Sequence, residues 1–183
     1  MKYYSEITLK NGRSCILRSG IGDDAEGVYK NFNLTHGETE FLLSYPDENS
    51  LDVSQEREFL LKREASQDEI ELCAVVDGRI VGTAGIEAVG RKDKVKHRAE
   101  FGISVERAYW GMGIGRALTE ACIECAKMAG YSQIELSVVS GNENAVFLYE
   151  SVGFVEYGRN PRGFQTRRGE WQELILMRRE LKQ

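Results

Sequence analysis

Three glycines alternate along Gly111-Met112-Gly113-Ile114-Gly115, immediately ahead of an amphipathic stretch. Glycines at the start of a helix leave backbone N–H groups uncovered, and the positive end of the helix dipole lies behind them. This arrangement predicts an anion site, most naturally one for a phosphate or pyrophosphate. Two commoner phosphate motifs are excluded by spacing. No Lys-Ser/Thr follows as in a P-loop, and Arg116 or Leu118 stands where a dinucleotide fingerprint needs its third glycine.

The residues around this turn resemble a known family. The segment 103–118 is similar to the coenzyme A signature of the GNAT family of N-acetyltransferases, Gln/Arg-x-x-Gly-x-Gly/Ala. About thirty residues on, 138–154 is similar to the second signature of that family, with an Asn after strand five, an Ala, a Leu-Tyr pair and a Gly-Phe. The opening Gln/Arg of the first signature falls on Trp110, so one side-chain donor is lost. Arg116 could offset that loss.

The resemblance implies acetyl-CoA as co-substrate. Main-chain N–H groups of the glycine turn would hold its pyrophosphate, and Ile103, Ser104 and Val105 would pair with the amides of its pantetheine arm. Asn142 would bridge the end of strand five and the cofactor, although it could equally serve as a helix N-cap. The implied cofactor-binding residues are Ile103, Ser104, Val105, Gly111, Met112, Gly113, Ile114, Gly115, Arg116, Asn142 and Tyr149.

Two residues are the catalytic candidates. Tyr149 resembles the tyrosine that meets the departing sulfur in this family; the alternative is a half-buried helical aromatic. A base is needed because an amine with a pKa near 10.4 is almost wholly ammonium at pH 7, a penalty of roughly 4–5 kcal/mol. Glu100, on the fourth strand, is where many family members carry an acidic residue that acts directly or through water. His97 is the other candidate by its pKa.

The elements that must position these residues indicate an α/β fold. It is expected to be a GNAT-like mixed, mostly antiparallel central sheet with helices on both faces, and the resemblance implies splayed strands four and five. Ser54 is expected to cap the second helix, and the pair Asp77-Gly78 predicts a hairpin turn. Expected strands are 6–18 (turning at 11–12), 72–76, 79–88, 98–105, 134–138, 154–159 and 171–178, with helices over 23–32, 53–63, 114–129 and 145–152.

Length and composition bound the remaining expectations. A chain of 183 residues and 20.7 kDa predicts one N-acetyltransferase domain over 1–183, with an acceptor-side part over 1–70 and a coenzyme A core over 71–183. The net charge of −5 argues against nucleic-acid binding. Neither a signal-peptide pattern nor an apolar run of membrane-spanning length is present, and four cysteines then suggest reduced thiols in the cytoplasm.

Three further clusters have two interpretations each. Glu38 to Glu71 holds eleven acidic against three basic residues, a balance of −8, which fits either a solvated face or a surface that attracts a cationic substrate. Cys122 and Cys125 have C-x-x-C spacing, but they fall in a helical core stripe and no second pair completes a metal set. The arginines of the C-terminal part fit a solvated loop or a contact with an anion: Arg159, Arg162, Arg167 and Arg168.

Together these observations predict an acetyl-CoA-dependent N-acetyltransferase, in which a primary amine attacks the thioester directly in a ternary complex. The acceptor would be a small-molecule or peptide amine, with a cationic one favoured, and no metal is implied. A competing hypothesis is a non-catalytic acyl-CoA sensor or interaction module on the same fold. Whether two copies associate as a homodimer is left open.

Overall fold

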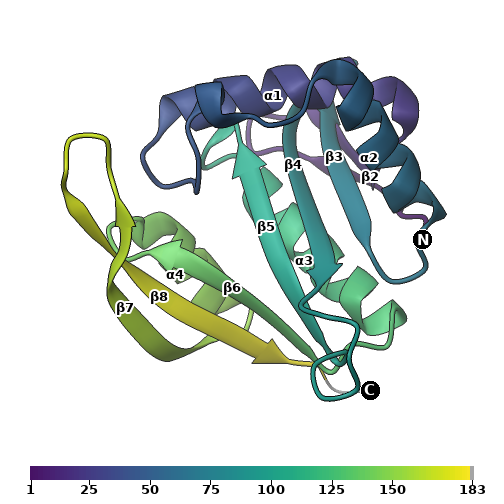
Figure 1. Ribbon diagram of the computed structural model, residues 1–183. Coiled ribbons are helices and arrows are strands. Elements are labelled where there is room, and N and C mark those ends of the chain that lie inside the picture. Colours follow the sequence, from purple (N-terminus) through teal and green to yellow (C-terminus); the bar gives the residue numbers. More distant parts are fainter. Residues whose placement is uncertain (182–183) are drawn as a thin grey trace.

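One eight-stranded sheet runs through the computed structural model, which describes residues 1–181 (Figure 1). The strand order is β1-β2-β3-β4-β5-β6-β8-β7, and every neighbouring pair is antiparallel except β5 and β6. The mixed, mostly antiparallel sheet expected from the sequence is confirmed. The strands are β1 (Tyr4–Thr8), β2 (Ser14–Ser19), β3 (Ile70–Val76), β4 (Arg79–Ala88), β5 (Arg98–Val105), β6 (Gln133–Val139), β7 (Val155–Gln165) and β8 (Trp171–Glu180).

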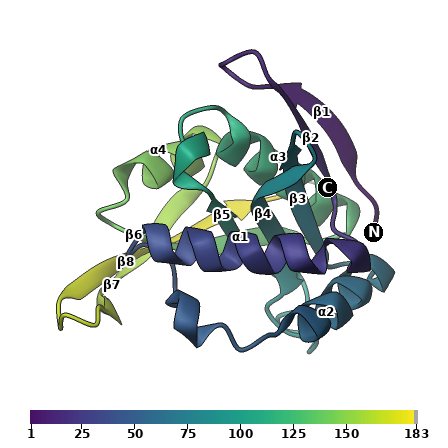
Figure 2. The ribbon, with the colours of Figure 1, turned by 90° about the horizontal axis from the view of Figure 1, so that it is seen from above.

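Helices cover both faces of the sheet, as expected. Figure 2 shows α1 (Ala25–Glu38) and α2 (Val53–Ala65) on one face, and α3 (Ile114–Met128) and α4 (Glu143–Ser151) on the other. Strand residues therefore sort by parity, because successive side chains point to opposite faces. In the centre of the sheet, Leu72, Ile86 and Phe101 pack in the cluster that includes α3, whereas Cys73 packs with α1 and α2.

The structure confirms three local predictions: the turn at 77–78, the strand 98–105 and the buried stripe of α3. Asp77 and Gly78 both have positive φ, 48° and 76°, as a two-residue turn between β3 and β4 requires. The strand 98–105 has the expected bounds. The stripe of α3 is buried: Ile114, Leu118, Ala121, Cys122 and Cys125 are at most 2% exposed. Cys122 and Cys125 are thus core residues.

Other element boundaries differ from those expected. The first segment forms two strands, and α1 continues six residues past Phe32 to Glu38. The N-cap of α2 is Asp52 rather than Ser54, since the Asp52 carboxylate accepts from the Gln55 N–H at 2.9 Å. β7 extends to Gln165, because a strand at the edge of the sheet with many exposed side chains lacks the alternation from which its length could be read.

The parallel strands β5 and β6 separate after a short contact, and Figure 1 shows β6 leaning away from β5. Their register covers only Arg98↔Gln133, Ala99↔Ile134 and Glu100↔Glu135. These are strands four and five of the family order, so the expected splay is confirmed. The other edge of β5 pairs with β4 without a register shift from Ala99 to Val105.

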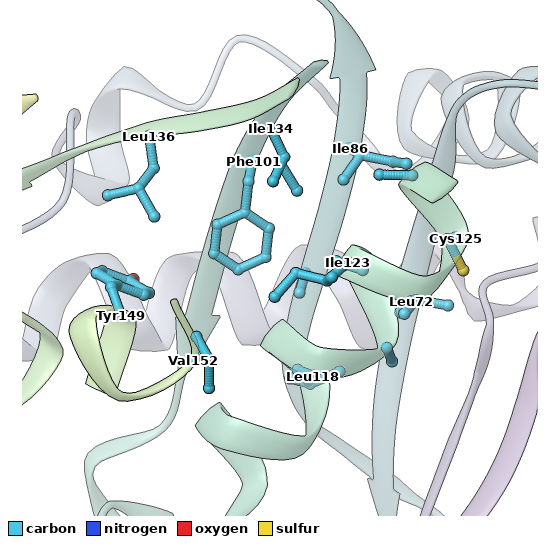
Figure 3. Packing of buried hydrophobic residues seen from close by; sticks show 14 of the residues in the cluster. Leu72, Ile86, Phe101, Leu118, Ile123, Cys125, Ile134, Leu136, Tyr149 and Val152 are labelled. Carbon is cyan, nitrogen blue, oxygen red and sulfur yellow. The ribbon is translucent and has the colours of Figure 1, made fainter. Parts of the chain in front are cut away.

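The core beneath the splay is aromatic and aliphatic. Figure 3 shows Phe101 of β5 facing Tyr149 of α4, with Leu136 of β6 and Val152 close by. The Phe101 and Tyr149 rings meet edge to face at 6.1 Å and 84°, a favourable aromatic geometry. This packing fixes α4 against the point where the sheet opens.

Candidate active site

A groove of about 570 Å³ lies on the sheet where β5 and β6 diverge. Its walls come from α1, the loop after it, α2, β6, α4 and the β7–β8 hairpin, and its floor from β3, β4 and β5. Five of the residues expected at the site line it together: Glu100, Ile103, Ser104, Asn142 and Tyr149. The splay therefore brings the expected catalytic pair and part of the cofactor set into one space.

The open edge of β5 forms one side of this groove. Beyond Glu100 this edge has no β6 partner, so alternate residues of the stretch from Phe101 to Val105 present their backbone groups over about 16 Å. Unpaired strand groups favour pairing with another extended chain. The amides of a pantetheine arm have the hydrogen-bonding groups that such an edge takes.

The glycine turn lies outside the groove, at the N-terminus of α3. Gly111 and Gly113 have φ of +73° and +105°, in the left-handed region that favours glycine. Gly113 is the N-cap of α3, and the Ala117 N–H is the first donor of the helix bonded to its carbonyl, at 3.1 Å. The N–H groups ahead of Ala117 lack helical acceptors. A Cβ at Gly111 or Gly113 would meet nothing within 4 Å, so the space above these donors is open.

The side chains beside this turn are engaged within the protein. Trp110 donates its indole N–H to the Val105 carbonyl at 2.7 Å, so its one donor is used to tie the turn to the end of β5. Arg116 donates to Ser151 Oγ of α4 at 2.7 Å. The Arg116 guanidinium is thus held against α4 in this structure, and the main-chain groups of the turn stay the expected anion donors.

Tyr149 and Asn142 reach the groove from opposite ends of α4. Asn142 is the N-cap, with its side-chain oxygen accepting from the Ala145 N–H at 3.4 Å, which confirms the capping prediction. Tyr149 is 7% exposed, and burial raises the pKa of its hydroxyl above the usual 10.0. A tyrosine with a raised pKa holds its proton, so it is suited to donate a hydrogen bond.

Glu100 belongs to a row of three carboxylates across the sheet. It stands directly opposite Glu87 of β4 and Glu135 of β6. Burial, then Glu87 and Glu135, raise its pKa, while Arg98 lowers it. Arg98 itself binds Glu135 through two bonds of 2.7 Å. Glu100 is therefore a groove carboxylate whose environment makes it a better proton acceptor than an isolated carboxylate.

Titratable residues that were not expected also line the groove, among them Glu71 of β3 and His36 of α1. Burial and the nearby Glu56 raise the pKa of Glu71 to about 7, whereas Arg63 and Thr83 lower it. An acid as second residue of the apolar run Ile70–Val76 was a signal, but the strand was expected to start only at Leu72.

His36 was not predicted as a site residue because the first helix was expected to end at Phe32. The Phe32 and His36 rings, one helical turn apart, stack with 3.6 Å between their centroids, and burial lowers the pKa of His36. His36 Nδ1 lies 2.8 Å from the Phe32 carbonyl, which can only accept, so Nδ1 carries the proton and Nε2 is the free acceptor.

The structure keeps other candidates away from this groove. His97 is exposed in the loop before β5, on the side where β5 and β6 still pair, and it does not line the groove. Arg159 pairs with Glu156 and Glu173, and Arg167 pairs with Asp47 at 2.8 Å. Within residues 1–181, no three His, Cys, Asp or Glu side chains gather as a metal site would need.

Arg167 has a structural role at the groove. Besides its ion pair with Asp47, the Arg167 guanidinium lies 4.1 Å from the centre of the Tyr45 ring, and the Arg167 backbone N–H donates to the Tyr45 hydroxyl at 3.0 Å. These contacts fasten the β7–β8 hairpin to the loop between α1 and α2. No helix in the part of the chain described here is long and apolar enough to cross a membrane.

Comparison with known proteins identifies the family. Residues 35–154 match the model of the acetyltransferase (GNAT) family, and the chain belongs to that family. It is 32% identical over 110 residues to an L-amino acid N-acetyltransferase of Escherichia coli, covering 60% of this chain and 67% of that protein. Among the curated relatives, the matched part spans as little as 26% of the relative's length.

Solved structures agree on the fold. A GNAT acetyltransferase from Streptococcus pneumoniae superimposes with a TM-score of 0.87 at 30% identity, covering 91% of this chain and 99% of that one. A putative acetyltransferase from Salmonella typhimurium, solved with acetyl-CoA, superimposes with a TM-score of 0.81 at 20% identity over 91% of this chain and 94% of its own. That second structure contains the cofactor that the sequence motifs imply.

Proposed function

We propose that this protein is an acetyl-CoA-dependent N-acetyltransferase that moves the acetyl group to a primary amine by direct attack in a ternary complex. The observation that carries the proposal is the groove itself. It joins an unpaired β5 edge and the buried Tyr149 to a floor of carboxylates. An extended acyl carrier fits the first part, and an ammonium group fits the second.

The residues present fit acetyl-CoA. The donors at the N-terminus of α3 face open space where a Cβ would lie, as a pyrophosphate site requires. We assign the pyrophosphate to the main-chain N–H groups of 111–116, the pantetheine arm to 103–105, and a further contact to Asn142. When bound, acetyl-CoA supplies the thioester that the amine attacks.

The protein's own groups account for the chemistry of the transfer. We propose that a groove carboxylate, with Glu100 as the one implied by the resemblance, holds the acceptor ammonium and favours its deprotonation. A backbone N–H of the open β5 edge faces the developing oxyanion, and the Tyr149 hydroxyl donates a hydrogen bond to the departing sulfur. Holding both substrates together supplies much of the acceleration. None of these steps needs a covalent enzyme intermediate.

The division of labour along the chain follows from the layers. Helices α1 and α2 cover the face that carries Glu71 and Glu100, so we assign residues 1–70 mainly to the acceptor side and 71–183 to the coenzyme A core. The acceptor is proposed to be a cationic small-molecule or peptide amine. Four buried free thiols support a reducing compartment such as the cytoplasm: Cys15, Cys73, Cys122 and Cys125.

A panel of amines with acetyl-CoA, read by release of free thiol, tests the proposal. The panel should include amino acids, diamines, polyamines and lysine-bearing peptides. We expect amine-dependent thiol release with at least one class and an acetylated product of matching mass. Tight acetyl-CoA binding by calorimetry, with thiol release no faster than the uncatalysed reaction for every amine, would instead indicate the acyl-CoA sensor.

A further inference from the structure

The groove floor contains a strip without side chains. Gly85 of β4 and Gly102 of β5 stand directly opposite each other, and the next residue across from Gly85 is Glu71 of β3. On either side of this strip, the same face carries Glu87 opposite Glu100 and Thr83 opposite Ser104. The two glycines therefore form a shallow channel between a carboxylate row and a hydroxyl row.

Gly85 allows the Glu71 carboxylate to lie across β4. A Cβ at this position would overlap Glu71 Oε2 and would lie 2.9 Å from the Ile70 carbonyl oxygen. The carboxylate thus occupies the place that any other side chain at position 85 would fill. At Gly102, one strand spacing of about 4.8 Å further, a Cβ would meet nothing within 4 Å. The Glu71 carboxylate faces open space above the strand that opens at the splay.

The cation nearest to Glu71 is already committed elsewhere. The Arg63 guanidinium binds Glu69 and donates to Glu87 Oε2 at 2.6 Å. Within residues 1–181 Glu71 has no ion-pair partner of its own. The charged and titratable groups around Glu71 are Arg63 and Glu56 of α2, Glu69 immediately before β3, Glu87 of β4, Glu100 of β5 and His36 of α1. A cationic ligand would supply the missing partner.

We propose that Glu71 receives the acceptor ammonium in the space above Gly85 and Gly102 and takes its proton, directly or through one water, before the amine attacks. This inference rests on the proposed N-acetyltransferase function and names a base outside the family motifs. Glu100 then contributes negative charge at the side of the channel.

The proton balance of this step is simple. The ammonium nitrogen loses one proton to a Glu71 carboxylate oxygen, and the freed lone pair forms the new C–N bond as the C–S bond breaks. The remaining excess proton of the amide nitrogen goes to the departing sulfur, which leaves as the thiol. Glu71 returns its proton to solvent. Its pKa of about 7 matches what a general base needs at neutral pH.

The test compares Glu71→Gln with wild type and with Glu58→Gln, an exposed acid of α2 outside the groove. The best amine of the panel is used, and kcat/KM is measured from pH 5.5 to 9.5. Wild type should lose about tenfold per pH unit below pH 7 and level off above it. In Glu71→Gln, kcat/KM at pH 7 should be at least a hundredfold lower than in wild type. It should then rise about tenfold per pH unit, because only the free amine reacts. Glu58→Gln should follow wild type.

Thermal unfolding and acetyl-CoA affinity of each variant show that the fold and cofactor site are intact. If Glu71→Gln does not fold, Glu71→Asp should keep the limb near pH 7 at a lower rate, because the carboxylate remains but is shorter. The inference is overturned if a Glu71 variant matches wild type both in kcat/KM and in the shape of its pH profile. If only Glu100→Gln loses the limb near pH 7, the base is Glu100 instead. Wild-type turnover in the same assay separates these outcomes from failure of the proposed function.

Discussion

Replacing Tyr149 by phenylalanine removes one oxygen atom from the groove and changes little else. The hydroxyl has no hydrogen-bond partner within residues 1–181, and the ring packs through its edge against Phe101 and at 5.9 Å from Phe154. Phenylalanine preserves those contacts. We therefore expect Tyr149→Phe to fold normally, to bind acetyl-CoA with unchanged affinity, and to lose kcat.

The size of the loss follows from what the hydroxyl does. A reference tyrosine has a pKa near 10 and a thiol near 8.5, so full proton transfer to a free thiolate is uphill by roughly 2 kcal/mol. Burial raises the pKa of Tyr149 further, which makes that transfer less favourable still. The remaining role is a hydrogen bond to developing charge on sulfur, worth about 1.5–3 kcal/mol. The expected loss in kcat is therefore about ten- to a hundredfold.

Steady-state thiol release and isothermal calorimetry measure the two quantities separately. An interaction formed only in the transition state lowers kcat and kcat/KM together and leaves the dissociation constant of acetyl-CoA alone. The alkaline pH profile should be the same in both proteins, because no tyrosinate forms in this range. Equal kcat in wild type and Tyr149→Phe would refute the role and leave Tyr149 as packing.

Three other perturbations test the cofactor site, the fold and the groove floor. Gly113→Ala should weaken acetyl-CoA binding at least tenfold, roughly 1.4 kcal/mol, because φ of +105° strains alanine and its Cβ enters the space above the turn. Gly130→Ala, which has φ of +82° beyond the other end of α3 and whose Cβ would also meet nothing within 4 Å, is the matched control, and equal calorimetric affinities in the two variants would remove the turn from the site. Glu106→Gln should lower the free energy of unfolding in urea by about 1–3 kcal/mol, since Glu106 is 2% exposed and accepts two bonds from Arg79, at 2.5 and 2.7 Å. An unchanged urea midpoint would mean that solvent replaces the pair. Burial raises the pKa of Glu71 from 4.5 to about 7, so the charged carboxylate destabilises the folded state increasingly as the pH rises from 4.5 to 7. Glu71→Gln should thus raise the melting temperature at pH 8 and not at pH 4, and the same shift at both would contradict this account.

Local signals predicted the elements that hold the site. The turn pair Asp77-Gly78, the strand 98–105 and the buried stripe of α3 depend on backbone preference and on a clear period of apolar residues, which a sequence displays directly. The ends of α1 and β7 were missed because their last turns and pairs are polar. Their boundaries are set by packing against the loop after α1 and by pairing with β8.

The bonding partners of the site's side chains were harder to predict than its secondary structure. Arg116 could offset the donor lost at Trp110, but no pattern in the sequence indicates that its guanidinium bonds Ser151 on α4, thirty-five residues away in the chain. Glu71 was missed for a similar reason. The place of its carboxylate depends on Gly85 of β4, and the open space beyond it on Gly102 of β5. No spacing along the chain encodes the register that brings these three residues together.

The acidic segment shows why net charge alone is a poor guide to an acceptor. Of its eleven acids, several are engaged in the fold: Glu38 accepts from the Arg107 N–H at 2.7 Å, Asp47 pairs with Arg167, and Asp68 pairs with Arg91. Glu56 is 6% exposed, so a charge reversal there would damage the core instead of reporting on the substrate.

What remains for an incoming amine is a short-range arrangement, with Glu71 and Glu100 beside a channel floored by two glycines. An ion pair formed inside a partly buried groove is screened by salt much less than one on the surface. If these two carboxylates select the acceptor, its KM should respond strongly to Glu100→Gln and weakly to Glu58→Gln or to added salt. The opposite ranking would place selection in the diffuse field of the whole segment.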